Sequence, residues 1–195
     1  MIMRVALTID AEHPDNPTVD PIGNAERILD LLRAGQVRAT FFVQSSWAGA
    51  YPQLVGRMVE DGHLVGSHSH WHCIYTSMSH DGIVDDLDRS RAGLAAVGVS
   101  PGDLFRLPGG QGSTDPEILA ALSVGGFTHV GWTMICGDWS PNWSVPQVVD
   151  AIMADGERHE FDGLSVPVVH SWSDVTPPAL EQVVSRLARA GEDHD

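Results

Sequence analysis

The chain alternates between short apolar runs and longer helical patterns along almost its whole length. Four helical patterns, over 28–32, 54–59, 83–97 and 118–122, stop at Gly35, Gly62, Gly98 and Gly125. Glycine just past a helix readily adopts the left-handed conformation that turns the chain away. Further helices are expected over 145–153 and 180–188, the last closed by Gly191, and strands over 5–9, 39–43, 63–66, 104–105, 128–130 and 165–169. Strand–helix units of this size predict an α/β fold with parallel strands.

No linker or shift in composition divides this series. We therefore expect a single domain over residues 1–190, followed by a polar tail over 191–195. A chain of 195 residues is long enough for one domain with a sizeable core. Periodicity alone leaves a doubly wound sheet and a barrel as alternatives. In both folds, binding and catalytic residues belong at the carboxyl ends of the strands.

The charge of the chain excludes several classes of function. Eleven basic and 26 acidic residues give a net charge of −15, which disfavours nucleic acids and anionic membranes as partners. All eleven basic residues are arginine, so mechanisms that need a Schiff-base, P-loop or kinase lysine are excluded. Neither a signal-peptide pattern nor an apolar run of about 20 residues is visible, so a cytoplasmic location is expected.

Polar residues with catalytic potential follow five of the expected strands. They are Asp10, Glu12 and His13; His68, His70 and His72; Arg106; Asp138 with Trp139; and His170. Because the carboxyl ends of parallel strands share one edge, we expect these side chains to converge. As alternatives, the acids belong to a solvated loop, Arg106 forms a peripheral salt bridge, and His170 is structural.

The segment His68-Ser69-His70-Trp71-His72 is the strongest local signal. If the chain turns helical after the strand, His68 and His72 lie one turn apart on one face. Two such imidazoles and a carboxylate are a common divalent-metal ligand set. Asp10 and Glu12 share one side of an extended strand, so one is expected to bind the metal while the other acts as a base. His13 is an alternative ligand, and His70 is expected to point elsewhere.

In this order, the motifs resemble those of the polysaccharide deacetylase family, the NodB-homology domains of carbohydrate esterase family 4. Thr8-Ile9-Asp10 is similar to the first motif, His68 to His72 to the second, and Arg106-Leu107-Pro108-Gly109-Gly110 to the third. Asp138-Trp139 and Val168-Val169-His170 resemble the fourth and fifth. The resemblance implies a distorted, incomplete (β/α) barrel of about seven parallel strands and a hydrolase that removes N-acetyl groups.

The resemblance also assigns roles to individual residues. It implies Asp10 as the catalytic base, steadied by Arg106, and His170 as the acid, oriented by Asp138. His68 and His72 would bind the metal. The usual second Asp of the first motif is Ala11 here, so Glu12 is expected to be the third ligand, as in branches with Asp-x-Glu. Gly109, Trp139 and Val168 are expected to border the acyl pocket, with the Gly109 backbone stabilising the oxyanion.

These inferences predict a metal-dependent deacetylase that cleaves carbon–nitrogen amide bonds. The metal is expected to be Zn²⁺, with Co²⁺ or Ni²⁺ also compatible with the ligand set. The substrate would be an N-acylated sugar or a small amide. Two alternatives remain: a cyclic-amide hydrolase on the same scaffold, and a non-catalytic carbohydrate-binding protein that has lost the metal, which Ala11 favours.

Overall fold

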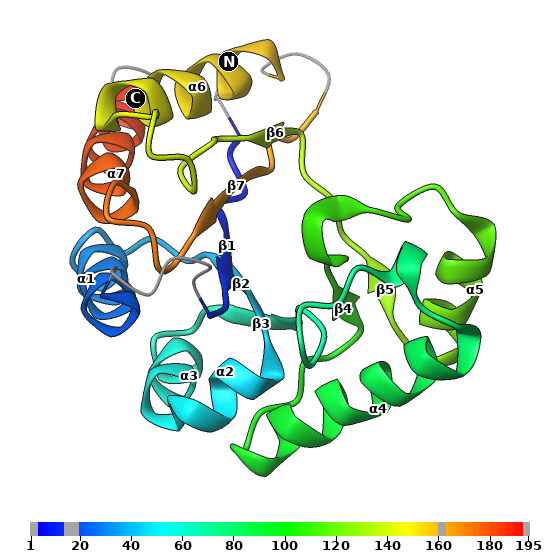
Figure 1. The fold of residues 1–195 in the computed structure, drawn as a ribbon. Helices are drawn as coiled ribbons and strands as arrows, with labels where there is room; N and C mark the ends of the chain where they lie inside the picture. Colours follow the sequence, from blue (N-terminus) through cyan, green and yellow to red (C-terminus); the bar gives the residue numbers. More distant parts are fainter. Residues whose placement is uncertain (1–3, 14–19, 160–162, 193–195) are drawn as a thin grey trace. The chain divides into compact units, whose positions relative to one another are not determined.

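The computed structural model describes residues 4–13, 20–159 and 163–192 (Figure 1). Its strands are β1 (Thr8–Ala11), β2 (Thr40–Val43), β3 (Leu64–Ser67), β4 (Leu104–Phe105), β5 (Thr128–His129), β6 (Met134–Ile135) and β7 (Pro167–His170). They form one sheet in the order β5-β4-β3-β2-β1-β7-β6. The pairs β2–β3, β3–β4, β4–β5 and β6–β7 are parallel. The predicted α/β class and strand number are confirmed.

The chain groups into two compact units, which we describe separately. The first comprises residues 1–9, 14–39 and 132–195, and the second comprises residues 10–13 and 40–131. The boundary passes through β1, so Asp10 and Glu12 belong to the second unit.

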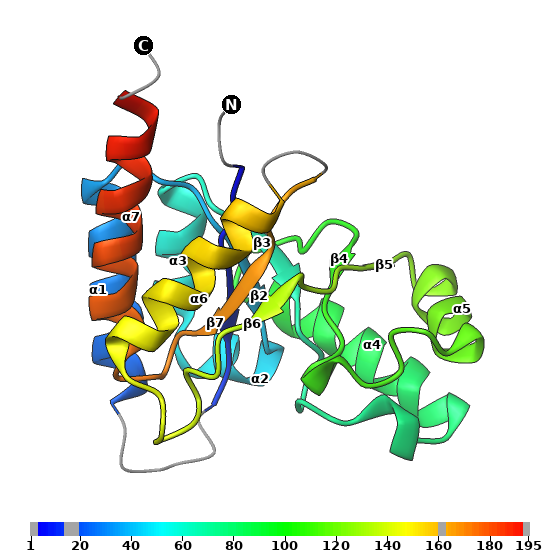
Figure 2. The same cartoon turned by 90° about the horizontal axis from the view of Figure 1, so that it is seen from above.

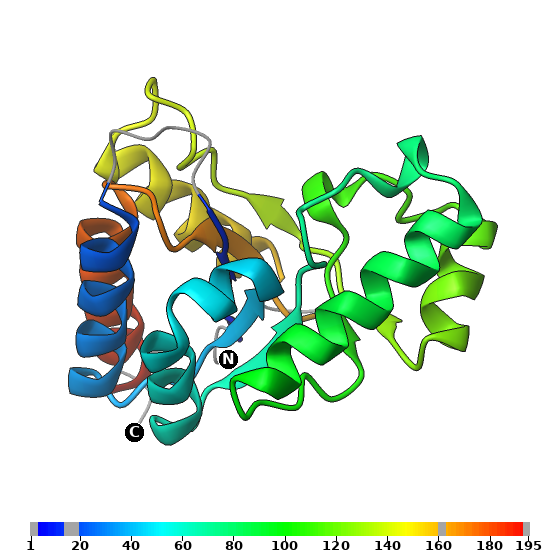
Figure 3. The ribbon, with the colours of Figure 1, turned by 60° about the horizontal axis from the view of Figure 1, so that its bottom comes forward.

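In the second unit, helices α2 (Ser45–Ala50), α3 (Pro52–Glu60), α4 (His80–Ala96) and α5 (Pro116–Val124) accompany β2 to β5. Figure 3 shows α4 beside α5. An apolar cluster joins these two helices to β4 and contains Tyr75, Ile83, Leu87, Phe105, Leu107, Ile118, Ala121, Leu122 and Phe127. In the register of β2 and β3, Gly66 stands opposite Phe42. A Cβ at Gly66 would lie 2.9 Å from the Phe42 ring, so this close strand contact requires glycine.

In the first unit, helices α1 (Pro21–Ala34), α6 (Val145–Arg158) and α7 (Thr176–Glu192) accompany β6 and β7. Figure 2 shows α7 beside α1 and α6. Their fully buried side chains include Ile28, Leu29, Leu32, Val148, Val149, Ile152 and Leu180. Among the described residues, no helix has the length and apolar composition needed to cross a bilayer.

Most expected helix ends agree with the structure, with one exception. Helix α1 ends before Gly35 and α5 before Gly125, while Gly62 and Gly98 follow α3 and α4 with positive φ. Helix α7, in contrast, continues through Gly191 to Glu192. Two residues assigned to the tail are therefore helical, and residues 193–195 lie outside the described part of the chain.

Asp155 on α6 is a buried carboxylate that connects three segments of the first unit. Its oxygens accept hydrogen bonds from Thr133 Oγ1 at 2.5 Å, Ser165 Oγ at 2.7 Å and Arg158 Nη2 at 3.0 Å. Burial alone would raise the pKa of Asp155, but these hydrogen bonds and the nearby His159 lower it below its usual value. The ionised form is therefore favoured in the folded state.

We expect Asp155→Asn to reduce the free energy of unfolding at pH 7 by about 1–3 kcal/mol, because an amide nitrogen replaces an acceptor that faces donors. Since the folded pKa is lowered, the ionised carboxylate stabilises the fold above about pH 4, and this contribution disappears as the pH falls through the folded pKa. The difference in free energy of unfolding between the wild type and Asp155→Asn should therefore become smaller in acid. Urea unfolding across pH measures it, with Asp150→Asn, an exposed position on the same helix, as the control. Equal losses at both positions would contradict this role.

Candidate active site

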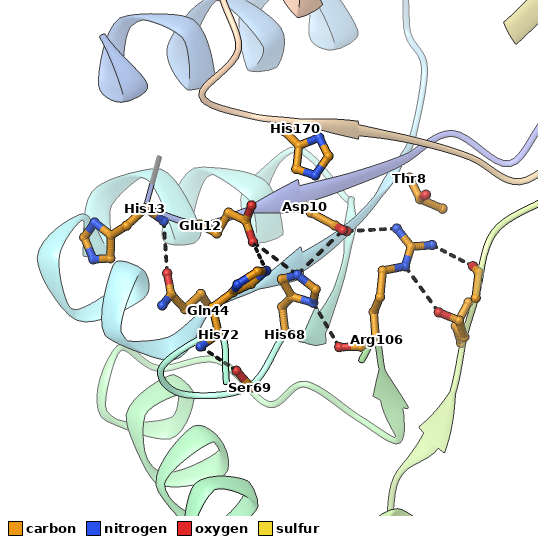
Figure 4. Close-up of polar contacts among 12 residues, drawn as sticks. Thr8, Asp10, Glu12, His13, Gln44, His68, Ser69, His72, Arg106 and His170 are labelled. Atoms are coloured by element: carbon orange, nitrogen blue, oxygen red, sulfur yellow. Dashed lines mark hydrogen bonds and ion pairs between the residues drawn. The ribbon is translucent and has the colours of Figure 1, made fainter. Parts of the chain in front are cut away.

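The carboxyl ends of β1 and β3 bring three potential metal ligands together in the second unit (Figure 4). Glu12 Oε2 lies 2.8 Å from His72 Nε2 and 3.2 Å from His68 Nε2. One ligand atom from each of the three residues falls within 4.8 Å of the others. Asp10 Oδ2 also approaches His68 Nε2, at 3.7 Å. Asp10 and Glu12 therefore share one side of the extended chain, as their spacing predicts.

A hydrogen bond to the backbone fixes the orientation of His68. Its Nδ1 lies 2.9 Å from the carbonyl oxygen of Arg106. A carbonyl only accepts, so Nδ1 carries the proton, and in the neutral ring Nε2 presents a lone pair to Glu12. A lone pair facing a carboxylate 3.2 Å away requires a proton or a cation between them. This donor set, with an outer hydrogen bond that orients an imidazole, therefore fits a divalent metal.

The Glu12 carboxyl group is held in its ionised form. Glu12 is only 6% exposed, and burial by itself would raise the pKa of its carboxyl group. Hydrogen bonds and charge interactions with His68 and His72 outweigh this effect and hold the pKa of Glu12 well below its usual value. Metal binding at neutral pH would therefore not require removal of a proton from this ligand.

The segment after His68 forms a loop, so the helical turn considered from the sequence is wrong. Ser69 and His72 have φ values of 63° and 58°, a left-handed conformation that costs roughly 1–2 kcal/mol for each non-glycine residue. The loop compensates with local and distant hydrogen bonds. Ser69 Oγ accepts from the His72 amide at 2.8 Å, and the Ser45 amide of α2 donates to the Ser69 carbonyl at 3.0 Å. The loop turns His72 towards Glu12 without a helix.

The other two histidines of these segments lie outside the ligand group. His70 Nδ1 is 2.7 Å from Ser45 Oγ, and the ligand group of Glu12, His68 and His72 does not include His70. His13 is exposed, and its amide donates to Gln44 Oε1 at 3.0 Å. Its ring packs near Tyr51, with 6.1 Å between the ring centroids. The alternative of His13 as a ligand therefore has no support in the geometry.

Arg106 is a fully buried cation at the end of β4. Its Nη1 donates to Asp10 Oδ1 at 2.8 Å, while Nε and Nη2 donate to the carbonyls of Val130 and Gly131. The guanidinium also lies over the Phe42 ring, 4.1 Å from its centroid. Arg106 is therefore part of the core of the site, and the alternative of a peripheral salt bridge is wrong.

Gly109 follows Arg106 in a short turn, Pro108–Gly110, with a φ of 60°. The residue is exposed, and a Cβ added there would approach Ile74 Cδ1 at 3.5 Å. The turn thus uses the left-handed conformation that glycine adopts without strain. A side chain larger than hydrogen at this position would be strained by the backbone.

In the first unit, Asp138 holds His170 at the end of β7. Asp138 Oδ1 accepts from His170 Nδ1 at 2.9 Å, and Oδ2 accepts from the His170 amide at 2.7 Å. This pairing places the imidazole proton on Nδ1, so the nitrogen suited to proton transfer is Nε2. Thr176 Oγ1 donates to Asp138 Oδ2 at 2.7 Å and Ser173 Oγ to the Asp138 carbonyl at 2.6 Å. Sequence reasoning missed these two hydroxyls, because neither belongs to a motif.

The two residues of this unit that were predicted to border the acyl pocket differ in their exposure to solvent. Trp139 is 43% exposed, and its ring lies edge-on to that of His170 with 5.7 Å between centroids. Val168 is 1% exposed in β7 and packs in the core of its unit. Of these two, Trp139 presents an apolar surface to solvent, while Val168 is enclosed.

Comparison with known proteins identifies the family. The polysaccharide deacetylase family profile matches residues 3–130, so the chain belongs to that family. The Bacillus subtilis peptidoglycan-N-acetylmuramic acid deacetylase PdaA is 25% identical over 176 residues, which cover 87% of this chain and 63% of PdaA. The chain spans between 56% and 63% of the length of four curated relatives that it matches.

Solved structures agree with this assignment. A family 4 carbohydrate esterase from Streptomyces lividans, in complex with acetate, matches with a TM-score of 0.80 and 28% identity over 96% of this chain and 89% of that one. The predicted incomplete-barrel fold class of the family is thereby confirmed. A family 4 pseudoenzyme from Bacillus anthracis matches with a TM-score of 0.81 and 21% identity, covering 97% of this chain and 62% of that one. At that identity the likeness concerns the fold alone.

We expect Arg106→Met to destabilise the protein by about 3–5 kcal/mol, because it leaves the buried Asp10 carboxylate without its cation. Arg106→Lys should retain part of this stability but not all, since one ammonium does not reproduce the fork that reaches Asp10 and two carbonyls. Urea unfolding at pH 7 measures both losses. Arg89→Met, at a side chain that is 56% exposed and paired with Asp85, is the control and should leave the midpoint unchanged. Equal midpoints for wild type and Arg106→Lys would contradict this interpretation.

Proposed function

We propose that the protein is a metal-dependent hydrolase that removes an N-acyl group, with N-acetyl the expected case, from a carbohydrate or small amide. The observation that carries this proposal is the cluster of buried Glu12 and His68 with half-buried His72, beside the Asp10–Arg106 pair. Membership of the polysaccharide deacetylase family supports the reaction class. The names of the B. subtilis and S. lividans proteins support N-acetylated or other carbohydrates as the substrate class.

Glu12, His68 and His72 would hold the metal through one carboxylate oxygen and two Nε2 atoms. Imidazole and carboxylate ligands suit Zn²⁺, and also admit Co²⁺ or Ni²⁺. Such an ion would supply Lewis acidity and lower the pKa of water in the site. The buried Glu12 and His68 limit solvent access to the cluster, which strengthens electrostatic interactions there.

Asp10 would act as the general base that accepts a proton from water. Its Oδ1 is engaged by Arg106, so Oδ2, which faces His68 Nε2 at 3.7 Å, is the oxygen directed at the cluster. Arg106 balances the charge of Asp10 and holds its orientation. We infer that Arg106 is a positioning residue and Asp10 a proton acceptor.

His170 would act as the general acid that protonates the leaving amine through Nε2. Asp138 fixes its tautomer and supports the positive charge of the protonated ring. The backbone N–H near Gly109 is the proposed donor to the developing oxyanion. Trp139 and Val168 are proposed as borders of the acyl pocket. These roles are taken from the family motifs, and substitution of each residue tests its role separately.

The two alternative functions predict different behaviour of the same protein in assays. A cyclic-amide hydrolase would use the same ligands and differ in the pocket lining. A carbohydrate-binding protein without activity would bind glycans and release no acetate. A panel of N-acetylglucosamine oligomers, peptidoglycan fragments, small N-acetyl amides and cyclic amides, assayed with added zinc, separates the three. Release of acetate from an N-acetylated compound supports the proposal, and turnover of cyclic amides alone would contradict it.

We expect the purified protein to bind about one Zn²⁺ at the cluster, as measured by competition with a chromophoric chelator. Glu12→Gln should weaken binding by more than the roughly 10–100-fold that loss of an outer-shell partner causes, because it removes a ligand and its charge. His13→Ala, at an exposed histidine of the same segment, is the matched control and should bind zinc like the wild type. Equal weakening in both variants, or unchanged binding in Glu12→Gln, would rule out this ligand set.

We expect Asp10→Asn to lower the turnover number by about 10²–10⁴-fold with zinc still bound, because the amide cannot accept the proton of water. His170→Ala should cause a loss in the same range by removing the acid. Acetate release under saturating zinc measures both, and the chelator assay verifies metal loading. Turnover of Asp10→Asn equal to that of the wild type would discard its assignment as the base.

A further inference from the structure

Asp86 on α4 is a buried carboxylate directed at the loop between the two histidine ligands. It is 2% exposed, and it accepts hydrogen bonds from two amides of that loop and from the hydroxyl of Tyr75, which follows the loop. Oδ2 accepts from the His70 amide at 3.1 Å and from the Tyr75 hydroxyl at 2.9 Å, and Oδ1 accepts from the Trp71 amide at 3.3 Å. No sequence motif pointed to this residue.

The three donors of Asp86 lie on both sides of His72 in the chain. The amides of His70 and Trp71 precede it, and the Tyr75 hydroxyl follows it. A carboxylate that holds both flanks restricts the rotation of the peptide units on which His72 is mounted. These contacts connect Asp86 to His72 through the backbone of the loop.

Helix α2 donates hydrogen bonds to carbonyl groups of the same loop. The Ser45 and Ser46 amides donate to the carbonyls of Ser69 and His70 at 3.0 and 3.3 Å. Asp86 accepts from amides of the loop, and amides of α2 donate to its carbonyls, so these backbone polar groups before the left-handed His72 are satisfied from two helices. This arrangement keeps a strained loop in one conformation.

We propose that Asp86 is a positioning residue that sets the zinc affinity of the site by fixing the loop that carries His72. The inference rests on the proposed metal-dependent function, because it needs His72 to be a ligand. Outer-shell partners of metal ligands typically change affinity by about 10–100-fold. Here the partner acts through the backbone of the ligand loop instead of through a ring nitrogen.

The test compares the same substitution at two adjacent positions of α4. Asp86→Asn is nearly isosteric but turns one acceptor into a donor that faces an amide or the Tyr75 hydroxyl. Asp85→Asn is the matched control, because the Asp85 side chain is 62% exposed and pairs with Arg89 at the surface. We expect zinc dissociation constants, from chelator competition, to rise about 10–100-fold in Asp86→Asn and to stay unchanged in Asp85→Asn.

Thermal unfolding in the presence of a chelator separates positioning from loss of fold. A folded Asp86→Asn protein that binds zinc like the wild type would overturn the inference. Wild-type protein that binds no zinc would instead overturn the proposed function. If Asp86→Asn does not fold, Tyr75→Phe decides, because it removes one donor and keeps both amide contacts. Zinc binding about threefold weaker or more in Tyr75→Phe supports the inference, and unchanged binding overturns it.

Discussion

The buried guanidinium of Arg106 sets the arrangement of the second unit. A cation with no solvent exposure needs a carboxylate and further acceptors, and here they come from Asp10 and from the carbonyls of Val130 and Gly131. The pairing directs the other oxygen of Asp10 towards His68, whose Nδ1 is in turn bonded to the Arg106 carbonyl. The ionic contacts that stabilise this unit are therefore the same contacts that shape the candidate site.

Local signals were sufficient to predict the order of the longer elements and the edge of the sheet that carries the predicted ligands of the metal. Gly62 and Gly98 follow helices in a left-handed backbone conformation that other residues avoid, and this preference of glycine is visible in sequence. The convergence of Asp10, Glu12 and the two outer histidines also followed from sequence, because parallel strands bring their carboxyl ends to one edge. No feature of the sequence could supply the tautomer of His68, which depends on a carbonyl 38 residues away.

The parts that sequence missed depend on distant partners or on very short elements. Helix α2 has six residues and strand β6 has two, which is too short for a periodic pattern. The loop after His68 has its left-handed residues at Ser69 and His72, and neither is a glycine that would mark a turn. The loop is held by hydrogen bonds with Asp86 and with α2. These partners are distant in sequence and meet the loop only in the folded chain.

The replacement of the usual second Asp by Ala11 can be understood from strand geometry. Ala11 is fully buried, while Glu12 lies two residues beyond Asp10 and so shares its side of the extended chain. Two carboxylates and one guanidinium sum to a formal charge of −1 when His68 and His72 are counted in the neutral form that a metal ligand takes. A protein that only binds neutral sugars gains nothing from burying that charge, whereas a divalent cation would reverse its sign. Under the proposed function, such a net positive site would favour the oxygen that becomes negative during amide hydrolysis.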